Sequence, residues 1–254
     1  MGVKINNTGL VSVIMPVFNG QNTIVNSINS ILEQEYKKIE LIIIDDCSSD
    51  DTLSLVSKID DPRITVIKNE NNLGVAETRN KGIKISQGQY IAFLDSDDIW
   101  HKDKLSLQIS AMKKYKVYCS HGSYGLMSSS GDDMNQVIQA KLIVNSKDMM
   151  KYNHIGNLTG IYDQNKLGKF YQKPVGHEDY YMWNEVISKT DSVGVLKPIA
   201  LYRLVKGSVS SNKIKCFKWH YSALKDSHKL PFILRVYYMF HYCKNGILKL
   251  RTTN

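Results

Sequence analysis

Three aspartates follow directly after a short apolar stretch in the N-terminal half of the chain. Tyr90 to Leu94 reads YIAFL and predicts a buried strand, and Asp95, Asp97 and Asp98 come next. Parallel strands of an open α/β sheet present ligand-binding groups at their carboxyl ends. Carboxylate oxygens are ligands of the kind that Mg²⁺ and Mn²⁺ take. We therefore expect Asp95 and Asp97 to hold a divalent cation and, through it, a pyrophosphate.

The same residues have a simpler interpretation, because a solvated acidic turn shows the same pattern. Asp98 would then be the N-cap of the following helix, which is expected around Leu105, Ile109 and Met112. Short acidic motifs also arise by chance. The choice between the two interpretations depends on what lies near these aspartates in the fold.

A second predicted strand also ends in carboxylates. Ile39 to Ile44 (IELIII) is continuously apolar, and Asp45 and Asp46 follow it. Crossover connections bring the carboxyl ends of parallel strands to one edge of the sheet. Several acids at one edge repel one another unless a cation lies among them. The two strand ends together favour a metal-dependent site for a negatively charged ligand.

The elements that must position these acids alternate regularly over the first 120 residues. Strands are expected at 10–17, 39–44, 64–67, 90–94 and 117–120, with helices between them. This alternation predicts an α/β fold with a mainly parallel sheet flanked by helices. The second half is less regular, with a helix opening at Glu178 and a late strand at Val193 to Tyr202.

Two common nucleotide-binding signatures are missing. The first strand is followed by Phe18-Asn19-Gly20-Gln21-Asn22, which is not a glycine-rich phosphate loop, and no Walker lysine is present. A bound nucleotide would rely instead on a metal, on a carboxylate for the base, and on cations such as Arg79, Arg203 and Lys206.

The net charge of +9 is concentrated at the C-terminal end. From residue 213 onward, nine lysines and arginines face one acid, Asp226, so this tail carries +8 and the first 212 residues carry +1. A neutral body argues against a nucleic-acid partner. The four cysteines are widely spaced, residues 1–9 lack the apolar core of a signal peptide, and no apolar run approaches the roughly 20 residues that span a bilayer. A cytoplasmic location is expected.

Four ordered stretches resemble the inverting nucleotide-sugar glycosyltransferases of family 2, which have the GT-A fold. They are VSVIMPVFNG at 11–20, LIIIDDCSSDDT at 41–52, NLGVAETRNKG at 72–82 and YIAFLDSDD at 90–98. The resemblance is strong over about residues 10–120 and weaker at Glu178-Asp179 and Tyr202-Arg203. Four motifs in the family's order and spacing are far more specific than any single match.

The resemblance implies a role for each matching residue. Pro16 and Phe18 would shape the floor of a uridine pocket, and Asp45 or Asp46 would hydrogen-bond the uracil. Asp97, with Asp95, would hold Mn²⁺ or Mg²⁺, and Asp95 would also face the ribose or the sugar. The remaining nucleotide-sugar contacts are assigned to Asn19, Arg79, Ser96, Arg203 and Lys206.

The family's general base falls on Asp179, with Glu178 as the next candidate. Acids are also favoured in the first turn of a helix without any catalytic role, because of the helix dipole. The chain departs from the family at Cys47, where glycine is more usual, and after Tyr202-Arg203, where the frequent histidine is absent. The second departure bears on pyrophosphate contacts from the C-terminal side.

The basic tail interleaves aromatic and basic residues, among them Phe217, Trp219, Arg235 and Phe240. Such a pattern suits a helix lying in the headgroup layer of an anionic membrane. The alternative is an amphipathic helix that packs on the catalytic domain with a solvated basic face.

The expected organisation is a nucleotide-sugar-binding half at 1–120, an acceptor-binding half at 121–212 and a basic amphipathic helical tail at 213–254. The expected activity is sugar transfer from a nucleotide diphosphate, UDP by preference, to a hydroxyl of a saccharide or lipid-linked saccharide in bacterial surface-polysaccharide synthesis. The enzyme would work at the inner face of the cytoplasmic membrane. Two alternatives stay open: a sugar-1-phosphate nucleotidyltransferase, and a non-catalytic membrane-associated binding protein of the same fold.

Overall fold

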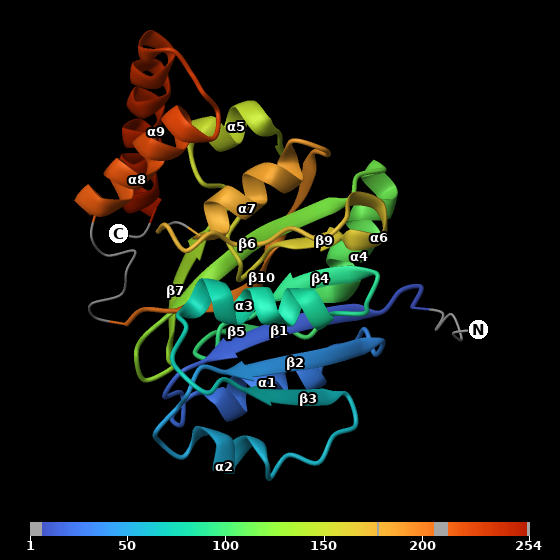
Figure 1. Cartoon of the computed structure of the whole chain (residues 1–254). Coiled ribbons are helices and arrows are strands. Elements are labelled where there is room, and N and C mark those ends of the chain that lie inside the picture. The colour runs from blue at the N-terminus through green and yellow to red at the C-terminus, as the bar shows by residue number, and fades with distance from the viewer. Residues whose placement is uncertain (1–6, 177, 206–212, 253–254) are drawn as a thin grey trace.

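One mixed sheet of ten strands, flanked by helices, forms the centre of the molecule (Figure 1). The computed structural model describes residues 7–176, 178–205 and 213–252, the side chains of 213 and 247–252 excepted. The strands are β1 Val11–Val17, β2 Ile39–Asp45, β3 Ile64–Lys68, β4 Tyr90–Phe93, β5 Ile99–Trp100, β6 Cys119–Met127, β7 Asp133–Ile138, β8 Ile143–Val144, β9 Ile161–Asp163 and β10 Ser192–Arg203. The helices are α1 Ile24–Leu32, α2 Thr52–Val56, α3 Val75–Ile85, α4 Lys104–Tyr115, α5 Ser146–Lys151, α6 Gln164–Leu167, α7 Glu178–Ile187, α8 Lys213–Asp226 and α9 Phe232–Thr252.

The first four strands form the parallel half of the sheet in the order β3-β2-β1-β4. Val11 pairs with Ile39 on one side and with Tyr90 on the other, so β1 is central. This register brings the carboxyl ends of β1, β2 and β4 to one edge, as the strand-helix alternation predicts. The acidic residues that follow β2 and β4 therefore share that edge.

The second half joins the same sheet through β9, a strand that the sequence patterns did not indicate. β9 runs antiparallel to both β4 and β6, and lies between them. β10 then pairs in parallel with β6. The sheet is therefore mixed: it is parallel from β3 to β4 and contains antiparallel pairs in the second half. The division of the chain at residues 120 and 212 stays a prediction.

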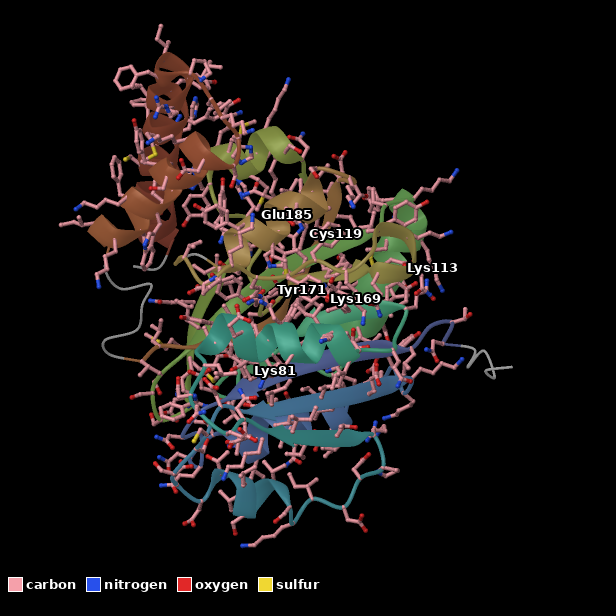
Figure 2. The ribbon with its side chains drawn as sticks, viewed as in Figure 1. Lys81, Lys113, Cys119, Lys169, Tyr171 and Glu185 are labelled. Atoms are coloured by element: carbon pink, nitrogen blue, oxygen red, sulfur yellow. The ribbon has the colours of Figure 1, made fainter. Side chains whose placement is uncertain are left out.

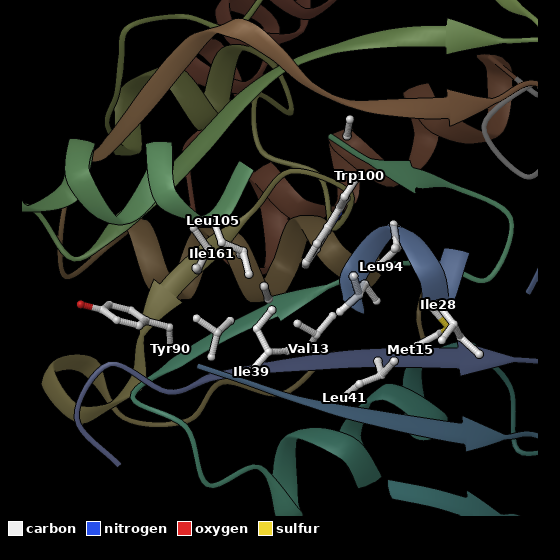
Figure 3. Close-up of a cluster of buried hydrophobic side chains, with 14 of the residues drawn as sticks. Val13, Met15, Ile28, Ile39, Leu41, Tyr90, Leu94, Trp100, Leu105 and Ile161 are labelled. Atoms are coloured by element: carbon white, nitrogen blue, oxygen red, sulfur yellow. The ribbon is translucent and has the colours of Figure 1, made fainter. Parts of the chain in front are cut away.

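Alternation along β1 builds two separate cores, one on each face of the sheet. Val13 and Met15 face α1 and α4, where they pack with Ile28 and Leu105 (Figure 3). Ile14 faces the opposite side, toward α3. Each isoleucine or leucine that is fully buried contributes about 1.5–3 kcal/mol relative to an exposed one. The continuous apolar runs of β1 and β2 are thus explained by burial on both faces.

Aromatic packing fixes α7 against the second core. The Trp183 indole is fully buried, with its ring centroid 6.1 Å from Phe93 and 6.0 Å from Tyr162, both edge to face. Gly160 lies directly beneath this ring, because a β-carbon there would be 2.1 Å from Cζ2 of Trp183. The backbone before β9 and the helix that opens at Glu178 are therefore in close contact.

The interpretation of Asp98 as a helix N-cap is wrong. α4 begins at Lys104 with Asp103 at its N-cap position, after the short strand β5. The Asp98 carboxylate accepts a hydrogen bond from the backbone N–H of Arg203 at 2.8 Å instead. It joins the end of the acidic motif to the end of β10.

The tail forms two helices separated at Pro231, as the sequence predicts. α8 and α9 lie beside α5, at the upper left of Figure 1. The His220 ring stacks on Tyr242 with centroids 4.2 Å apart, and its Nε2 lies 2.9 Å from the carbonyl oxygen of Met150. Within the ranges given above, no helix is long and apolar enough to cross a membrane.

The contact between Gly160 and Trp183 generates a stability prediction. Gly160→Ala inserts a methyl group into a rigid ring, and we expect it to lower the free energy of unfolding by about 1–3 kcal/mol. Gly246→Ala is the matched control, because a β-carbon there meets nothing within 4 Å and alanine favours a helix by about 0.5–1 kcal/mol. Urea unfolding of both variants checks this. Equal stability of the two variants would contradict the packing described.

Candidate active site

A cavity of about 480 Å³ opens at the carboxyl edge of the parallel strands. Its walls come from the segments that follow β1, β2 and β4 and from the start of α3. The lining residues are Pro16, Val17, Phe18, Asn19, Gly20, Thr23, Asp46, Asn72, Gly74, Val75, Thr78, Arg79, Asp95, Ser96 and Asp97. Most of the residues assigned above to nucleotide-sugar and metal binding therefore lie around one space.

The loops after β1 and β2 are tied together, which fixes one side of the cavity. Asn19 adopts a left-handed conformation with φ 51°, and its Oδ1 accepts from the backbone N–H of Ser49 at 2.9 Å. Its own backbone N–H donates to Ser48 Oγ at 2.9 Å, and Gly20 N–H donates to Thr52 Oγ1 at 2.8 Å. The Phe18 ring stays half exposed on this fixed loop.

The two adjacent aspartates at the end of β2 have different surroundings. Asp45 is fully buried and outside the cavity lining, and its Oδ2 accepts from the backbone N–H of Ser48 at 3.1 Å. Asp46 lines the cavity. Its carboxylate accepts from the backbone N–H groups of Leu73 and Gly74 at 2.8 and 2.9 Å. Of the pair, only Asp46 faces the space where a ligand would lie.

Hydrogen bonds keep Asp46 ionised. Burial raises the pKa of its carboxyl, but the bonds from Leu73, Asn69, Thr78 and Gly74 outweigh burial, so the pKa is lowered. Asn69 Nδ2 donates to Asp46 Oδ1 at 2.8 Å, and its Oδ1 accepts from Lys81 Nζ at 2.8 Å (Lys81 is labelled in Figure 2). Asp46 therefore carries a fixed negative charge and holds the 69–74 loop against the cavity.

An ion pair joins α3 to the end of β4. Arg79 Nη2 lies 2.6 Å from Asp95 Oδ1, and Arg79 Nη1 donates to Gln172 Oε1 at 3.1 Å. Arg79 is 6% exposed, so it is a buried residue of α3 and not a surface arginine. Its Nε–H is buried without a hydrogen-bond partner among the described residues. The guanidinium thus fixes Asp95 and retains one donor.

Asp97 lies in a strongly negative environment. Burial raises the pKa of its carboxyl, the charge of Asp95 raises it further, and Arg203 and Arg79 lower it by less. The pKa of Asp98 is raised well above its usual range by burial, with Asp97 and Asp95 as further causes. A cation in the cavity would offset the effects of burial and of the neighbouring negative charges, and would favour the ionised carboxylates.

Asp95 and Asp97 fit a divalent cation. The described residues contain no group of three or more histidine, cysteine, aspartate or glutamate side chains placed to hold a metal by themselves. Mg²⁺ and similar ions are commonly held by one or two carboxylates together with substrate phosphates, so a pair of aspartates at a ligand cavity is a suitable donor set. Burial and the charge of Asp95 raise the pKa of Asp97, and a cation bound between the two carboxylates would counteract both effects.

Arg203 supports the acidic turn from outside the cavity. It is buried, its Nε donates to the carbonyl oxygen of Asp97 at 2.8 Å, and its Nη1 donates to that of Ser129 at 3.1 Å. Arg203 therefore positions Asp97, and its direct contact with a nucleotide stays a prediction. Lys206, for which the same contact is expected, lies outside the described residues.

Glu178 and Asp179 open α7 and do not line the cavity. Asp179 Oδ1 accepts from the backbone N–H of Tyr180 at 2.7 Å. Its Oδ2 lies near Gly156, 3.9 Å from where a β-carbon on that glycine would be. The structure thus places this acidic pair at the start of α7 and outside the lining of the cavity.

A buried polar chain connects the cavity with α7. Gln172 Nε2 donates to Asn157 Oδ1 at 3.2 Å, and the same oxygen accepts from Trp183 Nε1 at 3.2 Å. The backbone of Gln172 exchanges two bonds with the Asn80 side chain, at 2.8 and 2.9 Å. Lys169, which is labelled in Figure 2, belongs to the same segment as Gln172. Its Nζ donates to the carbonyl oxygens of Lys84 and Ser86, at 2.8 Å each.

The sequence did not indicate this connection. Gln172, Asn157 and Asn80 lie on three separate segments, with no local motif that would bring them together. Asn72 and Gly74 were detectable, because they belong to the NLG motif and Gly74 has φ 83° at the start of α3. Such a backbone conformation favours glycine.

The comparison with known proteins gives a family match. Residues 12–174 match Glycosyl transferase family 2. The chain is 38% identical over 243 residues, 94% of each chain, to an Escherichia coli protein named UDP-Glc:alpha-D-GlcNAc-diphosphoundecaprenol beta-1,3-glucosyltransferase WfgD. The alignment covers almost the whole of both proteins.

Two solved structures share the fold at low sequence identity. TarS 1–349 of S. aureus, solved in complex with UDP-GlcNAc, has a TM-score of 0.69 at 18% identity, covering 92% of this chain and 71% of that one. The mannosyltransferase PcManGT of Pyrobaculum calidifontis, solved with GDP-Man and Mn²⁺, has a TM-score of 0.63 at 18% identity, covering 85% and 64%. These likenesses confirm the expected GT-A fold.

The buried contact between Arg79 and Gln172 can be tested directly. Gln172→Ala removes the hydrogen bonds to Arg79 Nη1 and to Asn157 Oδ1, and we expect the free energy of unfolding to fall by about 1–3 kcal/mol. Gln87→Ala is the control, because that side chain is exposed and a surface change is usually within about 0.5 kcal/mol. Chemical denaturation of both variants measures the difference. An unchanged midpoint for Gln172→Ala would show that the polar chain contributes nothing to stability.

Proposed function

The chain belongs to glycosyl transferase family 2, and from this membership we propose that it moves a sugar from a UDP-sugar to a hydroxyl of a lipid-linked saccharide, with inversion. The observation that carries the proposal is the cavity at the carboxyl edge of the parallel strands. Asp46, Arg79, Asp95 and Asp97, which the family motifs supply, all line it.

Family membership decides between the classes that the sequence left open. The chain is a glycosyltransferase by family, so the nucleotidyltransferase alternative is set aside. A missing carboxylate would favour the non-catalytic alternative, but Asp46, Asp95 and Asp97 are all present and line the cavity.

The donor is proposed to bind with its base near Asp46. The half-exposed Phe18 ring offers an apolar face to a base, and the ionised Asp46 carboxylate would accept from the uracil N–H. Arg79, whose Nε–H lacks a partner among the described residues, offers a donor to an oxygen of the donor sugar or phosphate. The relative WfgD is named for UDP-Glc, which supports UDP as the nucleotide.

Asp97, with Asp95, is proposed to hold Mn²⁺ or Mg²⁺ beside the diphosphate. When bound, such a cation neutralises charge on the departing diphosphate. This chain's own contribution is to hold the two carboxylates in place: Arg79 fixes Asp95, and Arg203 fixes the backbone of Asp97. PcManGT, which shares the fold, was solved with Mn²⁺, and this supports the choice of ion.

Asp179 is proposed as the general base, with Glu178 as the next candidate. A general base must lie within hydrogen-bond reach of the proton that it takes, so the orientation of the carboxylate is decisive. Asp179 would take the proton from the acceptor hydroxyl while the oxygen of that hydroxyl forms a bond to the anomeric carbon. The bond from that carbon to the diphosphate oxygen breaks with its electron pair leaving on the diphosphate. Attack opposite to the leaving group inverts the configuration.

The setting is proposed to be the inner face of the cytoplasmic membrane, in the assembly of a surface polysaccharide. WfgD is named for an acceptor that carries a diphosphoundecaprenol group, which is a lipid. An acceptor of that kind would stay in the bilayer while its saccharide enters the site. The enzyme would then have to act as a peripheral protein.

The metal assignment predicts the behaviour of Asp97→Asn. The variant loses a charged ligand, so we expect Mn²⁺ to strengthen UDP binding in the wild type and to have no such effect in the variant. Titration calorimetry of UDP with Mn²⁺ and with a chelator measures this, with the exposed Asp60→Asn as control. Metal-assisted binding that survives in Asp97→Asn would remove Asp97 from the ligand set.

The base assignment predicts a different defect for Asp179→Asn. The amide keeps the size of the side chain but cannot take the proton, so kcat should fall by roughly 10²–10⁴ while UDP affinity stays near that of the wild type. Steady-state release of UDP in the presence of acceptor measures kcat. Glu178→Gln serves as the companion variant. If it shows the larger defect and Asp179→Asn turns over normally, the two roles are exchanged.

A further inference from the structure

The outer face of α9 carries a continuous apolar stripe. Ile233 is 80% exposed, Phe240 69% and Phe232 64%, and Val236 and Tyr237 are about half exposed. These positions follow the three-to-four-residue spacing of one helical face. Isolated apolar side chains on a surface are ordinary, but a contiguous patch of large ones indicates a binding surface.

The opposite face of α9 is the one that packs on the protein. Met239 is buried, Tyr242 stacks on His220, and the Asn245 side chain reaches the carbonyl oxygen of Lys151 at 3.4 Å. The helix is therefore held to α5 and α8 by its inner side. The alternative in which the tail only packs on the catalytic domain explains this inner face. It does not explain why the outer face is apolar.

Basic residues accompany the apolar stripe. The exposed face of α8 presents Ile214 and Phe217 together with Lys218 and Lys225, and Lys229 lies exposed in the connection to α9. The segment from 213 onward has nine basic residues and one acid. Apolar and aromatic side chains mixed with lysines match the boundary between anionic headgroups and acyl chains.

We propose that the outer stripe of α9 inserts into the headgroup layer of an anionic bilayer, with the lysines of α8 and of the α8–α9 connection against lipid phosphates. The helix lies in the membrane surface and does not cross it. A second copy of the chain is the less suitable occupant, because two segments of charge +8 would repel each other face to face.

The tail is also packed directly against the start of α7. Gly176 has φ 73°, and a β-carbon there would be 2.4 Å from Cε2 of Trp219, so the indole covers this backbone. The His220 ring lies 5.1 Å from the Tyr180 ring, one residue after Asp179. Helices docked on the bilayer would therefore set the depth of Asp179 relative to a lipid-linked acceptor. This consequence rests on the proposed function, whereas the docking itself does not.

The test is binding of the full chain, without substrate, to phosphatidylglycerol-containing vesicles and to neutral phosphatidylcholine vesicles. The double variant Ile233→Gln/Phe240→Gln removes the two most exposed apolar side chains of the described part of α9, and we expect it to bind at least roughly tenfold more weakly. Val66→Gln/Leu196→Gln removes two exposed apolar groups elsewhere and should bind like the wild type. Lys218→Gln/Lys225→Gln/Lys229→Gln should lose the part of binding that salt weakens.

Three results would overturn the proposal. One is a wild type that ignores anionic vesicles, and another is an α9 double variant that binds as well as its control. The third is a concentration-dependent dimer that the α9 variant abolishes while vesicle binding is absent, which would assign the stripe to a second copy. Failure of the membrane proposal can be distinguished from failure of the proposed transferase function. The α9 variant should still release UDP with a water-soluble acceptor, and it should lose activity only on an acceptor embedded in vesicles.

Discussion

Negative charge at the carboxyl edge of the sheet is the constraint that organises this molecule. Parallel pairing of β1 with β2 and β4 forces the acidic ends of two strands into one place, and each carboxylate is accommodated in a different way. Hydrogen bonds lower the pKa of the Asp46 carboxyl, and Asp95 forms an ion pair with Arg79. Asp97 has a raised pKa because burial and Asp95 oppose its charge. Under the proposed function, this edge would receive a cation and a diphosphate.

The second half of the chain supports this edge by packing into it. β9 enters the sheet next to β4, and the segment after it carries Gln172 to the guanidinium of Arg79. The same glutamine reaches Asn157 and, through it, the indole of Trp183 on α7. The cavity at the carboxyl edge and the helix that opens with Glu178-Asp179 are therefore joined by one buried network of hydrogen bonds. A substitution of Gln172 or Asn157 would therefore remove hydrogen bonds from both parts.

The two helices of the tail have an inner face that packs on the protein and an outer face that is exposed. Its inner face is fixed by aromatic stacking, as between His220 and Tyr242, and its outer face presents Ile233 and Phe240 to the outside. A helix stabilised by one face alone would normally show polar residues on the other. The arrangement therefore favours an apolar surface in contact with the tail, next to the helix that carries the proposed base.

The sequence by itself determined the strands of the parallel half, because the continuous apolar runs of β1 and β2 follow from burial on both faces, and it determined the family through four ordered motifs. It also determined that the tail is basic and helical, with a break at Pro231. Only the tertiary structure decided that Asp46 rather than Asp45 faces the cavity, since adjacent residues of a strand point to opposite sides. It alone brought Gln172 to Arg79 and turned the apolar stripe of α9 outward, because such contacts join segments that share no local pattern.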